Sequence, residues 1–154
     1  MLKYDESKMA RKERLPRAVR DAIPEHHGTM VMAYFYVKAQ EQDPTVRREE
    51  FCYPGPKPRS KETAILMLAD AVGSASRSLE EPTPSRIRSL VTRIIEERVH
   101  QGQLDECGLT LQDLARVREA FYPVLTATFH VRTPYPEEPK RRTRSDADSR
   151  REAP

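Results

Sequence analysis

The sequence predicts an all-α protein, and two observations support that fold class. Apolar residues recur at intervals of three and four along most of the chain, which is the period of one face of a helix. No stretch shows a convincing strand pattern, and no internal repeat occurs. The 154 residues suffice for one domain with a real core, which we expect to span residues 1–132.

The first predicted helix covers residues 15–23 and opens on Pro16, because proline is favoured in the first turn of a helix. A second, apolar and aromatic helix is expected over residues 29–42. Residues 50–60 contain several prolines and a glycine, which restrict the backbone to turns and extended conformations. We therefore expect a loop between the second and third helices.

The third predicted helix begins at Ser60, a favoured N-cap residue, and is apolar almost all round over residues 64–72. Asp70 lies within that run, where we expect it to be buried. Burial of an unpaired carboxylate is costly, so a buried Arg or His, N–H donors or a metal ion must compensate it. Ser74 and Arg77 follow at one and two turns. An anion can approach along this line, and a structural network explains the two residues equally well.

The last two predicted helices begin with capping signals. Thr83 followed by Pro84 supplies an N-cap and a first-turn proline for one helix. Thr110, with Asp113 three residues later, begins the other. Pro123 is expected to kink that helix or end it early. The predicted apolar faces comprise Ile87, Leu90, Val91, Ile94 and Ile95 in the first helix and Leu111, Leu114, Val117, Phe121 and Leu125 in the second.

The excess of positive charge lies at the C-terminus. Residues 140–154 carry six Lys or Arg and three Asp or Glu, and this surplus equals the formal charge of +3 of the whole chain. The rest of the chain is therefore balanced, so binding of nucleic acid is not indicated, and binding through the basic tail is a lesser alternative. Residues 133–154 are rich in proline and charge, and we expect them to be disordered.

Signals for export, membrane insertion and disulfide formation are weak. Cys52 and Cys107 stand alone, without the spacing of a zinc site or a disulfide framework, so we expect free thiols. No run approaches the roughly 20 apolar residues that cross a bilayer. The charged N-terminus lacks the apolar segment of a signal peptide. We therefore expect a cytoplasmic protein without a membrane segment.

The adjacent His26 and His27 have two interpretations. Neighbouring side chains on a regular helix point about 100° apart, so one ion cannot easily bind both. Because Gly28 favours a terminal turn, the imidazoles can converge on a metal centre or serve neighbouring ions. Surface or capping histidines are the alternative. His100 and His130 lie near predicted helix C-termini, where we expect structural roles.

In the expected loop, Lys57 stands between Pro56 and Pro58, and Arg59 follows Pro58 directly. This position can present cations to a phosphate at little ordering cost, and the alternative is that both side chains are merely solvated. The sequence contains no nucleophile elbow, Gly-rich phosphate loop or H-E-x-x-H metal helix.

Three stretches stand in a distinctive order and spacing: "EHHGTMVMAYFYVKA", "YPGPKPRSKETAILMLADAV" and "GQLDECGLTLQDL". Together they closely resemble the C-terminal half of the intracellular HD-domain hydrolase of bacterial seven-transmembrane proteins, the PgpH-type cyclic-di-AMP phosphodiesterases. The resemblance runs from about Met9 to Pro136. It implies a partial HD-domain helical bundle, which membrane-anchored family members hold on the cytoplasmic side.

The resemblance also implies a centre of two divalent transition metals, manganese or iron, that hydrolyses a phosphodiester bond of a cyclic dinucleotide. His26 and His27 match the family's adjacent metal histidines, and Asp70 matches its late metal aspartate. We expect Arg77 and Lys57 to anchor phosphate, on the basis of their position and charge.

The family's earlier ligands, including its His-Asp pair, have no counterpart in this sequence, and a further family histidine falls at about Leu2. Three ligands cannot fill two metal sites, so we expect an incomplete centre, inactive unless a complementary chain supplies the others. The alternative is a non-catalytic binding or regulatory module with the same architecture. We expect Met30, Phe35 and Ile65 to lie on an apolar surface that favours self-association, for example as a homodimer.

Overall fold

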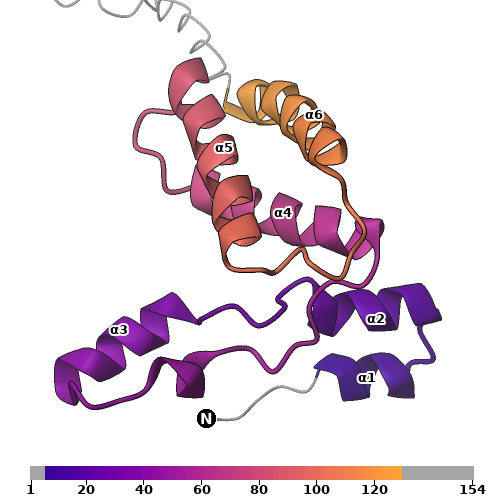
Figure 1. Cartoon of the computed structure of the whole chain (residues 1–154), viewed down its shortest axis with the longest axis vertical. Helices are drawn as coiled ribbons and strands as arrows, with labels where there is room; N and C mark the ends of the chain where they lie inside the picture. The colour runs from indigo at the N-terminus through magenta and orange to yellow at the C-terminus, as the bar shows by residue number, and fades with distance from the viewer. Residues whose placement is uncertain (1–5, 130–154) are drawn as a thin grey trace, which may run out of the picture.

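The computed structural model describes residues 6–129, which form six α-helices and one short 3-10 helix (Figure 1). Within these residues no strand forms, and an isolated bridge joins Val31 to Cys52. The predicted all-α fold is therefore confirmed. The elements are α1 (Glu6–Lys12), α2 (Arg17–Glu25), α3 (Ala33–Gln42), η1 (Arg48–Phe51), α4 (Lys61–Ser76), α5 (Pro84–His100) and α6 (Leu111–Phe129).

Helices α4, α5 and α6 pack against one another and contribute most of the buried core (Figure 1). The five residues predicted for the apolar face of α5 are all buried, and Leu114 and Val117 join them from α6. Leu111 was wrongly assigned to this face, because it is 82% exposed. It stands at the first position of α6 and lines a surface groove with Val99 and His100.

The predicted N-terminal caps are present. Ser60 caps α4 in a capping box with Thr63, and the Thr83 hydroxyl accepts a hydrogen bond from the first turn of α5. Thr110 and Asp113 exchange two hydrogen bonds of 3.1 Å at the start of α6. Each cap satisfies backbone N–H groups that a helix end leaves without partners.

Helix α6 continues through Pro123 to Phe129, so the expectation of an early end was wrong. Leu125 and Phe129, which follow the proline, pack against the core. This packing offsets the backbone hydrogen bond that proline cannot donate.

Helices α1 and α2 pack together, and α2 also contacts α4. Helix α1 was not predicted, because its sequence is charged and it buries only Ala10. Helix α3 packs on η1 alone among the described elements, and it buries none of its residues. Figure 1 shows α3 on the opposite side of the molecule from α1 and α2.

Residues 29–32 are not helical, so the second predicted helix begins later than expected. Met32 N donates to Phe51 O, and Tyr53 N donates to Met30 O, each at 2.8 Å. This pairing satisfies the backbone in an extended form and places the proline-rich loop beside the histidine turn.

Cys52 and Cys107 are free, as predicted. The helices formed by residues 6–129 include none with the length and apolarity needed to cross a bilayer. His130 and the tail predicted to be disordered, residues 133–154, lie outside the described residues.

Candidate metal centre

The adjacent histidines lie where α2 ends. His26 is the C-cap of α2, and Gly28 has a φ of +55°, a conformation that glycine adopts at low cost. The predicted end of the helix at this glycine is therefore confirmed. The rings of His26 and His27 have centroids 3.8 Å apart and an interplanar angle of 39°. The terminal turn thus brings the two imidazoles together, as a shared or paired metal site requires.

The ring of His26 is oriented by a contact with the backbone of α2. Its Nδ1 lies 2.9 Å from the carbonyl oxygen of Ala22, one turn earlier on α2. Because a carbonyl oxygen only accepts hydrogen bonds, Nδ1 donates this bond, and Nε2 is the ring nitrogen left for another partner. Histidines that bind metals commonly donate their second N–H to a carbonyl in this way.

His27 stacks on Tyr53, with ring centroids 4.4 Å apart and an interplanar angle of 10°. Burial lowers the pKa of His27, and the neighbouring His26 lowers it further. The charges of Asp70 and Glu6 oppose this pKa shift, so both carboxylates lie close enough to act on the ring. The net lowering favours the neutral imidazole, which is the form that binds a metal ion.

Asp70 is exposed, so the expectation of a buried carboxylate was wrong. Helix α4 is apolar on several faces, but α5 and α6 cover only part of it. Its open face carries Ile65 and Leu66, which are 36% and 43% exposed, together with Asp70. The desolvation cost inferred from the sequence therefore does not apply to this carboxylate.

The described residues do not bring three or more His, Cys, Asp or Glu side chains close enough together to hold a metal ion. The rings of His26 and His27 are in contact. The charge of Asp70 acts on His27, but the three side chains do not form a group close enough to bind one ion. His26, His27 and Asp70 therefore stay predictions as metal ligands.

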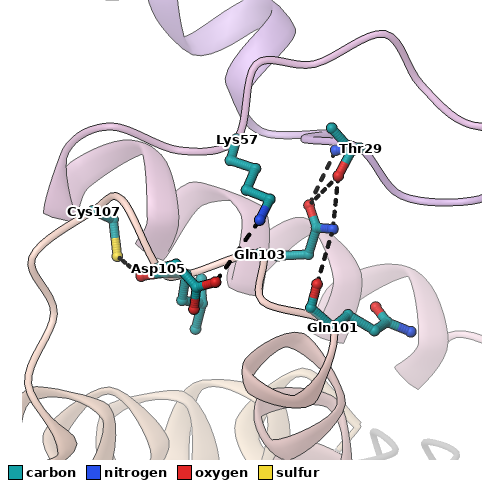
Figure 2. A network of polar contacts seen from close by, with 7 residues as sticks. Thr29, Lys57, Gln101, Gln103, Asp105 and Cys107 are labelled. Carbon is teal, nitrogen blue, oxygen red and sulfur yellow. Dashed lines mark hydrogen bonds and ion pairs between the residues drawn. The ribbon is translucent and has the colours of Figure 1, made fainter.

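The two candidate phosphate anchors lie in polar contacts of their own. Arg77, the C-cap of α4, donates from Nη2 to Ser74 Oγ at 3.1 Å, as the structural-network interpretation expects. Lys57 Nζ lies 3.8 Å from Asp105 Oδ2, and Figure 2 shows it directed toward that carboxylate. An ion pair this long and partly exposed contributes little to stability. Arg77 and Lys57 therefore stay predictions as phosphate anchors.

Glu25 is a supporting residue that the sequence did not reveal. It is only 6% exposed, and its Oε2 accepts hydrogen bonds from Thr63 Oγ1 at 2.7 Å and from Arg59 N at 3.0 Å. The carboxylate thus joins the last residue of α2 to the start of α4. Thr63 is 38 positions away in the sequence, and no local pattern predicts such a pair.

Gln103 holds Thr29, which follows the histidine turn, by hydrogen bonds that Figure 2 shows. Its Oε1 accepts from Thr29 N at 3.0 Å, and its Nε2 donates to Thr29 Oγ1 at 2.9 Å. A Cβ atom added to Gly28 would overlap Gln103 Oε1 and lie 2.7 Å from Met67 Cε. The turn is therefore packed closely against both α4 and the connection between α5 and α6.

Comparison with known proteins identifies relatives of this arrangement. No family model matches the sequence. The chain is 42% identical over 137 residues to the cyclic-di-AMP phosphodiesterase PgpH of Bacillus subtilis, a match that covers 89% of this chain and 19% of that protein. It is 36% identical over 134 residues to PgpH of Listeria monocytogenes, covering 87% of this chain and 19% of that protein.

The crystal structure of the L. monocytogenes PgpH HD domain in complex with cyclic-di-AMP matches with a TM-score of 0.76 and 35% sequence identity. This match covers 80% of the chain and 57% of the solved domain. The chain thus spans about a fifth of the length of the curated relatives and somewhat more than half of the solved domain. It is homologous to part of the HD domain of the PgpH cyclic-di-AMP phosphodiesterases.

Proposed function

We propose that the chain forms part of an HD-domain phosphohydrolase that cleaves a phosphodiester bond of cyclic-di-AMP. The observation that carries the proposal is the pair of imidazoles brought together on the turn after α2. The contact of His26 Nδ1 with the Ala22 carbonyl leaves Nε2 available to a metal ion, and the lowered pKa of His27 favours its metal-binding form.

Homology to an HD-domain phosphodiesterase implies the use of divalent metals, and the donors present suit them. Imidazole nitrogen binds iron and other transition metals, and carboxylate oxygen suits manganese. His26, His27 and Asp70 would hold the ions. When bound, such ions lower the pKa of water and stabilise charge on phosphoryl oxygens.

The protein's own residues orient these ligands. The Ala22 carbonyl fixes the ring of His26, and the Tyr53 ring supports His27 by stacking. Glu25 and Gln103 anchor the turn to α4 and to the connection after α5. These contacts reduce the ordering that metal binding requires.

Two ions need more than three ligands, and we propose that a further helical segment supplies the others by packing on the open face of α4. That face presents Ile65 and Leu66 beside Asp70. A cavity of about 560 Å³ between α2 and α4, lined in part by Leu66, Ala18 and Ala22, continues it. The segment can belong to the same polypeptide or to a partner chain.

Metal titration tests the ligand set. We expect His26→Ala and Asp70→Asn to weaken Mn²⁺ binding by about 10-fold or more, as loss of a donor group does. His100→Ala, at the exposed end of α5, is the matched control and should leave the affinity unchanged. Equal Mn²⁺ affinity in all three variants would contradict the proposal.

A hydrolysis assay tests the activity. Cyclic-di-AMP is incubated with the chain and Mn²⁺, with and without a polypeptide that covers the part of the Listeria HD domain outside the match. We expect hydrolysis only when the second polypeptide is present, and its loss in the His26→Ala variant. No hydrolysis under either condition would contradict the complementation.

A non-catalytic binding module is the second candidate, because the described residues form no group of three or more side chains that could hold a metal ion. It predicts that cyclic-di-AMP binds with the same affinity in EDTA and in Mn²⁺, and is never cleaved. The phosphohydrolase proposal predicts tighter binding with Mn²⁺, so one titration under the two conditions separates them.

Three further expectations stay predictions. Two of them, the cytoplasmic location and the membrane anchoring, describe intact, longer proteins, and this chain spans about a fifth of the length of its curated relatives. Self-association is consistent with the exposure of Phe35 and Ile65, whereas Met30 is partly buried. Sedimentation velocity over a range of protein concentrations tests it directly.

A further inference from the structure

A cavity of about 450 Å³ lies between α1 and α2, apart from the predicted metal ligands. Its lining contains three guanidinium groups and one carboxylate. The lining residues are Ser7, Arg11, Arg17, Arg20, Asp21 and Pro24.

The positive charge of this cavity is only partly matched. Arg17 Nε lies 3.3 Å from Asp21 Oδ2, so that carboxylate is already paired. Within residues 6–129, neither Arg11 nor Arg20 forms an ion pair, although both line the cavity. The charges of Arg11 and Arg20 are therefore available to an anion in the cavity.

The cavity adjoins the histidine turn. Pro24, which lines the cavity, lies in the last turn of α2, two residues before His26. Arg20 precedes Pro24 by one turn on the same face of α2. An extended ligand held at the turn can therefore reach Arg20 along this face.

We propose that this cavity binds a phosphate group through Arg20 and Arg11. Guanidinium groups match phosphate oxygens with directed, charge-assisted hydrogen bonds. A cyclic dinucleotide has two phosphodiesters on opposite sides of its ring, so with one of them at the metal ligands the other extends away from them. The cavity would bind this second phosphate. The identification of the ligand as a cyclic dinucleotide rests on the proposed function.

The test uses the full chain in EDTA, so that metal ligation does not contribute. The Nε–Hε NMR signals of the arginines are followed during titration with inorganic phosphate, AMP and, as the uncharged control, adenosine. We expect saturable shifts of the Arg20 signal with phosphate and AMP and none with adenosine. Shifts confined to other arginines would overturn the proposal and would show only general attraction to a basic chain.

Variants test which cation binds. Arg20→Gln should weaken phosphate binding by about 10-fold or more, as loss of a charged hydrogen-bond donor does. Arg93→Gln, on the exposed side of α5, should not change it. Equal affinities would overturn the proposal. The wild-type NMR titration decides the question even if Arg20→Gln fails to fold.

The outcomes also separate this proposal from the proposed function. Phosphate binding at Arg20 in a protein whose His26→Ala variant binds Mn²⁺ normally would support the cavity and contradict the metal centre. If His26→Ala loses Mn²⁺ binding as expected but phosphate causes no shift of the Arg20 signal, only the proposed phosphate site is overturned.

Discussion

Thr63 Oγ1 donates a hydrogen bond of 2.7 Å to Glu25 Oε2, and the two residues join the end of α2 to the start of α4. His26 follows Glu25 directly, and Asp70 lies two helical turns beyond Thr63. The contact therefore sets the position of the histidine turn relative to the helix that carries the candidate aspartate.

Glu25→Ala should lower the free energy of unfolding by about 1–3 kcal/mol, because it removes the 2.7 Å hydrogen bond from Thr63 Oγ1 and leaves the Arg59 N–H without its acceptor. Urea unfolding measures this loss. The exposed Glu106 provides the control, since Glu106→Ala should change stability by less than about 0.5 kcal/mol. Equal losses in the two variants would show that the buried contact is not important.

Two glycines should respond in opposite ways to alanine. Gly28 has a φ of +55°, and a Cβ there would overlap Gln103 Oε1, which Thr29 holds in place. Gly28→Ala should therefore cost about 1–3 kcal/mol. Gly73 lies inside α4 with open space around its Cβ position, so Gly73→Ala should gain about 0.5–1 kcal/mol. Thermal unfolding of both variants gives the two signs, and a stabilised Gly28→Ala would refute the tight packing of the turn.

The sequence predicted the features that depend on local chemistry. The caps at Ser60, Thr83 and Thr110 and the buried face of α5 follow from residue type and helical spacing, and all are present. The glycine after the histidines likewise marked the turn that brings the two rings together.

The sequence could not predict features that depend on distant segments. Whether Asp70 is buried depends on what covers α4, and the described helices leave that face open. Gln103 contacts Thr29 across 74 positions, and its amide side chain gives no local signal of that partner. Helix α1 was missed because it lacks an apolar face of its own.

Leu114 and Leu111 belong to one predicted apolar face but have different surroundings. Leu114 is buried between α5 and α6, so Leu114→Ala should cost about 2–5 kcal/mol. Leu111 is exposed, so Leu111→Ala should change stability by less than about 0.5 kcal/mol. Urea unfolding measures the loss of stability in each variant. Similar losses would agree with the periodic sequence pattern and would contradict the structure.

Asp113 links the start of α6 to α4 in a pH-dependent way. Its Oδ2 accepts from Lys61 Nζ at 2.8 Å and from Thr110 N at 3.1 Å. The Lys61 contact, followed by the bonds with Thr110, lowers the pKa of Asp113 from 3.8 to about 2. Since the folded-state pKa lies below the unfolded value, this carboxylate stabilises the fold above pH 3.8, and the contribution is lost as the pH falls toward about 2.

The stability advantage of the wild type over Asp113→Asn should therefore be constant above about pH 5 and should shrink steadily between about pH 4 and 2. Urea unfolding at a series of pH values measures this difference. Lys61→Met removes the largest cause of the pKa shift, so in that background the pH dependence of the Asp113→Asn effect should be weaker. A difference that stays constant down to about pH 2 would show that Asp113 contributes no charged contact to the folded state.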